Sequence, residues 1–138
     1  MEIKQISVFF ENKPGRLGEA TKVLADAKIN LRAISIADTA EFGILRLIAD
    51  DHEKAAEALK SAGFTARITN VAAVEIEDKP GSLAKGMDIF RQANINIEYL
   101  YASLEGKEGK AVVIFKLGEH SKGLELIREN KLSTVQAF

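Results

Sequence analysis

The sequence predicts an α+β fold made of two copies of one small unit, and three observations support this. One loop occurs twice, as ENKPGRL over residues 11–17 and as EDKPGSL over residues 77–83. The chain then stays in register as far as the dipeptide IN at 29–30 and at 95–96. Before each loop apolar residues alternate, and after it they recur every three or four residues, which are the periods of a strand and of a helix. Such an ordered match indicates a duplicated unit.

The first copy has the pattern strand, helix, strand, strand, helix, strand. Ile6, Val8 and Phe10 alternate along the first strand. A helix follows Pro14-Gly15, because the apolar residues after this turn keep helical spacing. The remaining elements are expected at residues 30–37 (strand), 44–49 (strand), 51–62 (helix) and 65–70 (strand).

The second copy repeats this order. Ala72, Val74 and Ile76 alternate along its first strand, and a helix follows Pro80-Gly81. The turn between its second and third strands is the Gly-rich EGKEGK, which is typical of a hairpin. The remaining elements are expected at residues 96–104 (strand), 111–117 (strand), 119–130 (helix) and 133–138 (strand).

This order of elements predicts a ferredoxin-like sandwich in each copy. Two right-handed crossovers place both helices on one face of a four-stranded antiparallel sheet. We assign residues 1–69 to the first unit and residues 70–138 to the second. The join ITNVAAVEI, residues 68–76, leaves almost no linker. We therefore expect the two units to pack edge to edge or to exchange a strand.

The composition excludes several classes of function. The 138 residues are 46% hydrophobic and 28% charged, with a formal net charge of −1, so no strong field attracts nucleic acid or an anionic membrane. The absence of cysteine removes disulfides, thiolate catalysis and most structural zinc sites. No signal-peptide pattern and no bilayer-spanning apolar run occurs. We expect a cytoplasmic protein with no metal, no cofactor, no nucleic-acid partner and no membrane partner.

The repeated loop is the strongest candidate binding feature. A helix start offers free backbone N–H groups, and these groups and the helix dipole favour a carboxylate. Gly15 and Gly81 let the backbone approach a ligand closely. The amide of Asn12 can donate to a carboxylate and accept from an ammonium group. Asn30 and Asn96 begin the second strand of each copy, where the other end of a zwitterion can be bound.

These residues resemble the ACT domain. The shared pattern is a strand ending in Asn or Asp, one residue, Pro-Gly, one residue and Leu, followed by IN at the next strand, and it covers nearly the whole chain. The resemblance implies a small-molecule sensor that binds an amino acid or related metabolite and regulates an attached or bound enzyme or transcription factor. In that family the ligand usually lies between two paired units, held by the loop of one and the second-strand start of the other.

The resemblance implies two sites in this chain. The first uses Asn12, Lys13, Pro14, Gly15, Arg16 and Leu17 of the first loop with Asn96, Ile97 and Glu98. The second uses Asp78, Lys79, Pro80, Gly81, Ser82 and Leu83 of the second loop with Asn30, Leu31 and Arg32.

The two candidate sites differ in charge. Asn12 becomes Asp78, whose ionised carboxylate only accepts hydrogen bonds, and Arg16 becomes Ser82, which removes a cation. Relatives that bind polar amino acids often carry a histidine two residues before the Asn, where this chain has Phe10. This departure favours a ligand more apolar than serine. We expect the first loop to be the stronger site.

The residues also leave other functions open. Pro-Gly can simply shape a turn, and the chain is then a structural or assembly module that acts through protein contacts without a ligand. RNA-binding domains share this topology but need a basic surface and aromatic residues on the central strands, and the third strand of the two copies offers only Phe115. His52 and His120 fall in different units and indicate neither metal binding nor catalysis. Tyr99 and Tyr101 share one strand face and fit a unit interface or a pocket wall.

Together these patterns predict a regulatory protein, not an enzyme. It binds a free amino acid or related metabolite at the interface of its two units and modulates a partner enzyme or regulator. Because exposed sheet edges have to be covered, we also expect a homo-oligomer such as a dimer.

Overall fold

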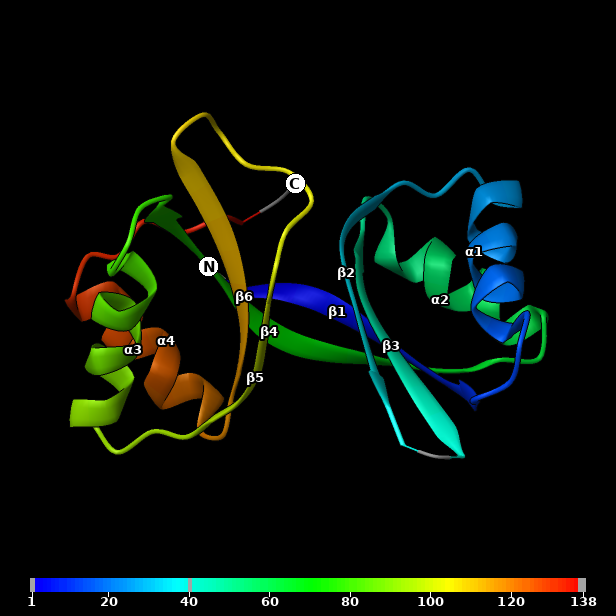
Figure 1. Ribbon diagram of the computed structural model, residues 1–138, viewed down its shortest axis with the longest axis horizontal. Coiled ribbons are helices and arrows are strands. Elements are labelled where there is room, and N and C mark those ends of the chain that lie inside the picture. Colours follow the sequence, from blue (N-terminus) through cyan, green and yellow to red (C-terminus); the bar gives the residue numbers. More distant parts are fainter. Residues whose placement is uncertain (1, 40, 137–138) are drawn as a thin grey trace. The chain divides into compact units, whose positions relative to one another are not determined.

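The predicted α+β class is confirmed by a computed structural model, which describes residues 2–39 and 41–136 (Figure 1). The order of elements is strand, helix, strand, strand, helix, strand, and the order then begins again. The elements of the first copy are β1 (Glu2–Glu11), α1 (Arg16–Asp26), β2 (Leu31–Asp38), β3 (Phe42–Ala49) and α2 (His52–Ser61). They are followed by β4 (Thr65–Glu77), α3 (Ser82–Gln92), β5 (Ile97–Ala102), β6 (Lys110–Leu117) and α4 (His120–Glu129).

The chain divides into two compact units. We call Lys4–Thr69 the N-terminal unit, and Met1–Ile3 with Asn70–Phe138 the C-terminal unit. Strands β1 and β4 therefore contribute residues to both units. Each unit is described by itself below.

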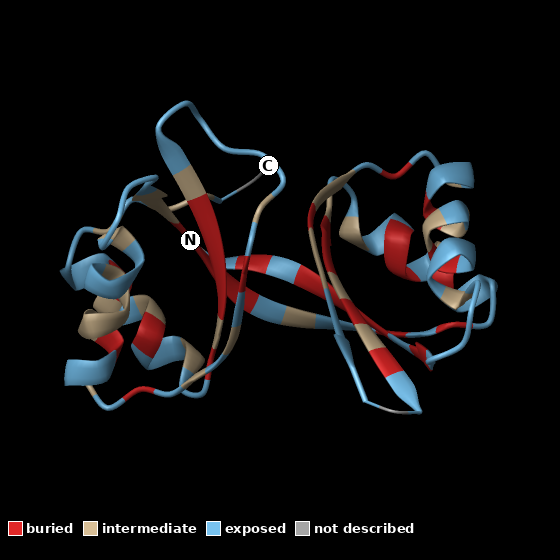
Figure 2. Cartoon of the chain, in the orientation of Figure 1, coloured by how far each residue is buried: buried red, intermediate tan, exposed pale blue. Residues whose placement is uncertain are grey.

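In the N-terminal unit, β3 lies between β2 and β1 and pairs antiparallel with both. Leu47 of β3 is opposite Ile6 on one side and Ile34 on the other. Both helices cover the same sheet face, as Figure 1 shows, and the buried residues of the sheet and helices are coloured red in Figure 2. This core contains Ile6, Val8, Phe10, Ala20, Leu24, Leu45, Leu47, Ala55, Ala56, Leu59 and Phe64.

The C-terminal unit repeats this arrangement. Strand β6 pairs antiparallel with β4 and β5, and Phe115 is opposite Ala72 and Leu100. Helices α3 and α4 cover one face, where the rings of Phe90 and Phe115 lie 5.8 Å apart. Its core contains Ala72, Val74, Phe90, Ile95, Val113, Phe115, Leu117 and Ile127.

Strand β4 is one continuous strand, whereas the sequence suggested separate strands at residues 65–70 and 72–76. The segment between them contains neither Gly nor Pro, so nothing in it requires a turn. Val71, Ala72 and Ala73 are fully buried, which favours extended chain through this position.

The prediction of a last strand at residues 133–138 was wrong for the residues that the structure describes. Thr134 forms an isolated bridge with Val74, and two backbone hydrogen bonds, Glu75 N to Ser133 O and Val135 N to Ala73 O, flank it. Residues 137–138 lie outside the described part. Within residues 133–136, the segment pairs with β4 only around this bridge.

Candidate ligand-binding loops

The two Pro-Gly loops have the same backbone geometry. Gly15 and Gly81 precede α1 and α3 with φ angles of 87° and 89°, a left-handed conformation that favours glycine. Within the described residues no side chain caps either helix. Helix α2 differs, because the Asp51 side chain accepts a hydrogen bond from Lys54 N at 3.0 Å. The starts of α1 and α3 thus keep backbone N–H groups available to an anion.

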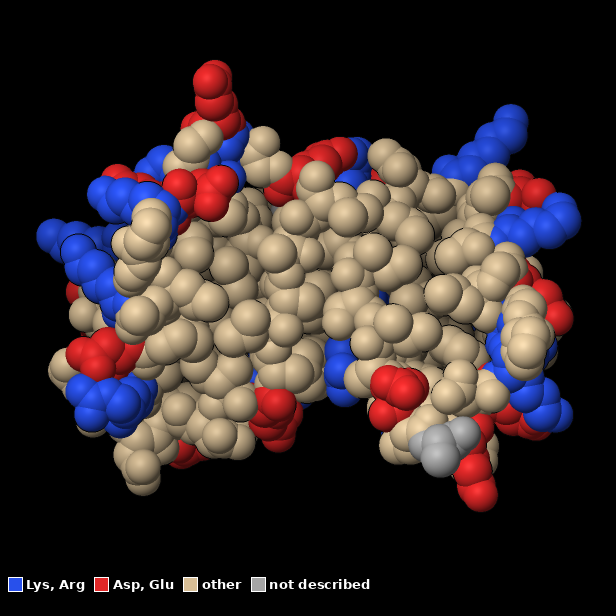
Figure 3. Space-filling view, viewed as in Figure 1, with Lys and Arg blue, Asp and Glu red and all other residues tan. Residues whose placement is uncertain are grey.

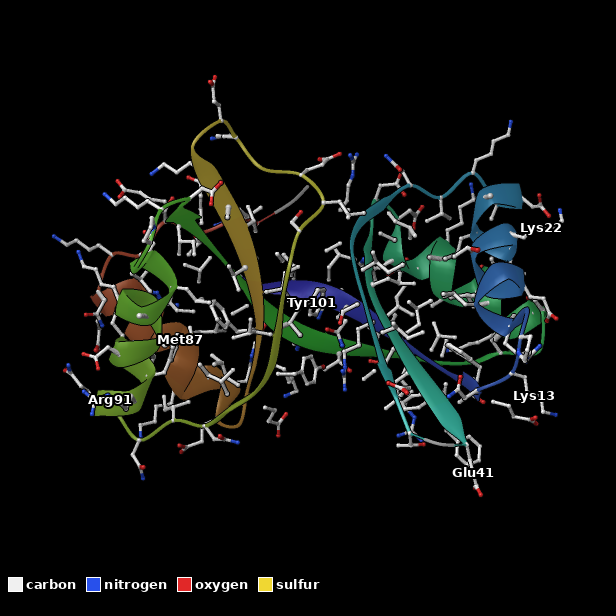
Figure 4. All side chains as sticks on the ribbon, viewed as in Figure 1. Lys13, Lys22, Glu41, Met87, Arg91 and Tyr101 are labelled. Carbon is white, nitrogen blue, oxygen red and sulfur yellow. The ribbon has the colours of Figure 1, made fainter. Side chains whose placement is uncertain are left out.

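Each loop is held to the neighbouring hairpin of its own unit. Asn12 N donates to Glu41 O at 2.8 Å, and Asn12 Nδ2 donates to Thr39 O at 3.1 Å. Figure 4 shows Lys13 and Glu41 at the same end of this unit. In the C-terminal unit, Asp78 N donates to Gly109 O at 3.0 Å. The Asn12 amide, predicted to bind a carboxylate, therefore has a structural hydrogen bond in this structure.

A lysine and a glutamate form an ion pair beside each loop. Lys13 Nζ lies 2.5 Å from a Glu11 carboxylate oxygen, and Lys79 pairs with Glu77 in the same way. The hydrogen bond from the lysine, followed by its charge, holds the pKa of each glutamate below its ordinary value. All four side chains are more than half exposed. These lysines therefore already balance a neighbouring carboxylate.

A pocket of about 460 Å³ opens beside the second loop, inside the C-terminal unit. Its walls come from the end of β4, the loop, the first two turns of α3 and the segment after α4. It is lined by Glu75, Ile76, Glu77, Lys79, Pro80, Gly81, Ser82, Lys85, Gly86, Ile89 and Leu132. The predicted residues Pro80 and Gly81 thus lie at a concave surface of the size that small ligands occupy.

The charged groups of this pocket come from both sides of the loop. Glu75 and Glu77 line the pocket from β4, where the Glu75 carboxylate accepts a hydrogen bond from Ser133 Oγ at 3.3 Å and Glu77 pairs with Lys79. Lys85 lines it from the first turn of α3. Among the described residues, Lys85 has no ion pair within 4 Å, but its charge contributes, after that of Lys79, to holding the pKa of Glu77 below its ordinary value. The apolar part consists of Ile76, Ile89 and Leu132. On the face of the molecule in Figure 3, Lys and Arg lie beside Asp and Glu over the helices of each unit.

The first loop has a different set of side chains at the equivalent place. The Arg16 guanidinium carbon lies 4.6 Å from the centre of the Phe64 ring, within the range of a cation–π contact. Arg16 also forms an ion pair with Glu19 at 2.6 Å. The equivalent residues of the second loop, Ser82 and Lys85, line the pocket instead. The sequence favoured the first loop, but the 460 Å³ pocket lies at the second.

The predicted second-strand residues lie away from the loop of their own unit. Asn30 N donates to Asp50 Oδ1 at 3.2 Å at the start of β2, whereas the first loop joins the far end of the sheet. In the C-terminal unit, Asn96 and Ile97 line a separate pocket of about 450 Å³ beside Arg91 of α3. One unit alone does not bring the two predicted sets together.

Among the remaining predicted residues, Leu17 and Leu83 are each 39% exposed at the helix starts. Glu98 lies 3.8 Å from Lys116 Nζ and forms an ion pair on β5 and β6. Leu31 packs against the core of the N-terminal unit. Sequence reasoning missed Lys85, Gly86, Ile89 and Leu132. In the sequence, the exchange of Arg16 for Ser82 favoured the first loop, whereas the accompanying exchange of Glu19 for Lys85 was the signal that was overlooked.

Neither histidine contributes to the pocket. His120 Nε2 lies 2.6 Å from Glu2 Oε2, within the C-terminal unit, and its other ring nitrogen is buried without a described partner. The described residues contain no cluster of three or more His, Cys, Asp or Glu side chains placed to hold a metal ion. No described helix is long and apolar enough to cross a bilayer.

Two ferredoxin-like units with matching Pro-Gly loops define the class of this protein as a tandem α+β repeat. A family model described as the ACT domain pair matches residues 1–137. The chain therefore belongs to the ACT domain pair family, which confirms the resemblance seen in the sequence.

Solved structures show the same fold. A protein from Bacteroides thetaiotaomicron is 40% identical, with a TM-score of 0.91, over 98% of this chain and 92% of that chain. The regulatory subunit of aspartate kinase from Thermus thermophilus is 20% identical, with a TM-score of 0.68, over 91% of each chain. The corresponding subunit from Thermus flavus is 20% identical, with a TM-score of 0.64, over 91% of this chain and 90% of that chain. A search of the curated proteins gave no match.

Proposed function

We propose that this chain is a non-catalytic regulatory protein that binds a free amino acid, or a related zwitterion, at its Pro-Gly loops and modulates a partner enzyme or regulator. One observation carries the proposal. The 460 Å³ pocket beside Gly81 is lined by an uncapped helix start, by Glu75 and Glu77, and by Lys85, which has no ion pair within 4 Å in the described part of the chain. These are the groups that complement both ends of an amino acid.

The chemistry of the pocket assigns a place to each part of such a ligand. The ligand carboxylate binds the first N–H groups of α3 and Lys85, where the helix dipole adds roughly 0.3–1 kcal/mol. The ligand ammonium binds Glu75 and Glu77, which accept hydrogen bonds and oppose its charge. The ligand side chain contacts Ile76, Ile89 and Leu132. This apolar part favours an aliphatic side chain over a polar one.

Regulation follows if the ligand prefers one of two arrangements of the protein, because a ligand shifts an equilibrium only by its differential affinity. Sensors of this kind work near metabolite concentrations, which corresponds to a binding free energy of roughly −8 to −4 kcal/mol. The similar fold of the Thermus aspartate kinase regulatory subunits supports a partner enzyme for this chain as well.

A thermal-shift screen against the common L-amino acids at millimolar concentration tests the proposal, since a ligand of the native state raises the melting temperature. We expect one chemical group of amino acids to stabilise the protein. Lys85→Ala should weaken that binding roughly tenfold, because a hydrogen bond to a charged group contributes about 1.5–3 kcal/mol. Lys22→Ala, an exposed lysine elsewhere that pairs with Asp26, is the control. A well-folded sample that responds to none of them contradicts amino-acid sensing.

A second candidate function, assembly through protein contacts, is favoured by an exposed aromatic patch on the N-terminal unit. Phe9 and Phe42 are 37% and 57% exposed on the sheet face away from the helices and line a hollow of about 180 Å³. Light scattering of the native protein and of Phe42→Ser tests this function. A change in molar mass that depends on Phe42 supports assembly through this face, and equal masses contradict it.

A further inference from the structure

The first turns of α1 and α3 differ in a way that bears on how many ligands one chain binds. Phe64 and Leu132 occupy the same place in their units, because each follows a helix and donates its N–H back to that helix. Phe64 N donates to Leu59 O at 3.0 Å, and Leu132 N donates to Ile127 O at 3.1 Å. Leu132 is a wall of the pocket beside Gly81. Phe64 is the ring that Arg16 covers.

The long side chain of Arg16 lies in the N-terminal unit where the C-terminal unit has its pocket. The guanidinium carbon is 4.6 Å from the Phe64 ring centre, and Glu19 binds the guanidinium at 2.6 Å. Only 33% of the Arg16 side chain is exposed. The short Ser82 cannot reach Leu132 in this way. Lys85 replaces Glu19, so no carboxylate holds a cation over this position.

We propose that Arg16 is a built-in plug that closes the loop site of the N-terminal unit, so that each chain has one open loop site, the pocket beside Gly81. Arg16 supplies a cation and Glu19 a carboxylate, and these two groups are already paired with each other. The single open site rests on the proposed ligand binding. The closure of the first loop can be tested without any ligand.

Matched cysteine variants test the closure directly, because the chain has no cysteine of its own. Ala20 and Gly86 are equivalent positions on α1 and α3. Ala20 is 0% exposed, whereas Gly86 lines the pocket and a Cβ there meets no atom within 4 Å. We expect Gly86→Cys to react with iodoacetamide at least about tenfold faster than Ala20→Cys, since a buried thiol reacts only through local opening. Adding Arg16→Ser to Ala20→Cys should then raise its rate by about tenfold.

Two controls separate loss of the plug from general loosening of the unit. Lys22→Ser, on the same helix, should leave the rate of Ala20→Cys unchanged. Ala56→Cys, on α2 and 4% exposed, should stay slow in the Arg16→Ser background. The proposal is overturned if Arg16→Ser does not accelerate Ala20→Cys, or if it accelerates both Ala20→Cys and Ala56→Cys.

Reciprocal variants then test the number of sites, by calorimetry with whichever common L-amino acid stabilises the native protein. We expect one molecule per native chain, two for Arg16→Ser/Glu19→Lys, and none for Ser82→Arg/Lys85→Glu. Two molecules per native chain would overturn the plug while leaving the proposed function intact. Faster labelling on loss of Arg16, in a protein that binds no amino acid, would instead support the plug and overturn the proposed function.

Discussion

Gly123 of α4 packs directly against the side chain of Leu117 on β6, so closely that a Cβ at this position would overlap Leu117 Cδ1. Leu117 is 0% exposed. The equivalent residues of the N-terminal unit are Ala55 and Ala49. The two units thus have side chains of different size at equivalent positions of this helix and strand. The C-terminal unit has glycine and leucine at these positions, and the N-terminal unit has two alanines.

Replacing Gly123 should therefore destabilise the C-terminal unit. We expect Gly123→Val to lower the free energy of unfolding by roughly 1–3 kcal/mol, the usual range for overpacking a core. Urea unfolding followed by circular dichroism measures this change. In a double-mutant cycle, Leu117→Ala should be less harmful with Val at position 123 than with Gly, by about 0.5 kcal/mol or more. Additive effects would show that the two side chains do not compete for the same space.

Alanine at the loop glycines should destabilise through the backbone alone. A Cβ at Gly15 or Gly81 meets no atom within 4 Å, but both residues have positive φ. Each change should lower the free energy of unfolding by about 1–2 kcal/mol, because a non-glycine residue is strained in the left-handed region. Gly18→Ala, inside α1 and equally unobstructed, should raise it by about 0.5–1 kcal/mol. Equal effects at Gly15 and Gly18 would contradict the assigned backbone geometry.

The two second helices should respond differently to loss of their N-cap residues. Asp51 caps α2 through its side chain, whereas Glu119 precedes α4 and makes no side-chain cap. Asp51→Ala should lower the free energy of unfolding by about 1 kcal/mol, and Glu119→Ala should change it by roughly half a kcal/mol at most. Thermal unfolding of the two variants side by side makes the comparison. A similar loss in both would argue against a specific cap at Asp51.

The ion pairs beside the loops predict a pH dependence in acid. The lysines hold the pKa values of Glu11 and Glu77 below the ordinary value in the folded state, so the folded protein loses these protons more readily than the unfolded chain. Their contribution to stability is therefore present above the ordinary glutamate pKa of about 4.3 and is lost as the pH falls through the folded value. Salt should weaken it, since both pairs are exposed.

Carboxyl chemical shifts in an NMR titration measure this effect residue by residue. Lys13→Ala should raise the pKa of Glu11 and leave that of Glu77 unchanged, and Lys79→Ala should do the reverse. An unchanged Glu11 pKa in Lys13→Ala would assign the lowering to another group.

Elements whose cause is local were predictable from the sequence. Pro14-Gly15 and Pro80-Gly81 indicated both helix starts, because a fixed φ followed by a left-handed glycine ends a strand and begins a helix. The continuity of β4 could not be predicted, because its two halves belong to different copies of the repeat. No turn residue separates those halves, and burial of Val71 to Ala73 decides the outcome.

Part of the candidate site was predictable from the sequence, because some of its residues belong to the local Pro-Gly motif. The motif identified Pro80 and Gly81, which line the pocket. Lys85 required the helix geometry, because one turn places it beside Gly81, to whose carbonyl its N–H donates at 3.0 Å. Leu132 comes from the far end of the chain and required the tertiary fold. The hydrogen bond from the Asn12 side chain to Thr39 O could not be predicted from the sequence either, because it joins a loop to a hairpin far away in the chain.

The sharing of β1 and β4 between the units has a consequence for synthesis on the ribosome. The N-terminal unit has all of its residues once Thr69 has emerged, so it can fold while the rest is still being made. The C-terminal unit must wait until its helix α4 has been translated. Residues 2–3 then have to be available to it, with Glu2 held by His120 at 2.6 Å. A nascent chain stalled so that residue 70 has just left the ribosome should therefore resist protease over Lys4–Thr69, while residues 2–3 remain accessible until α4 has also emerged.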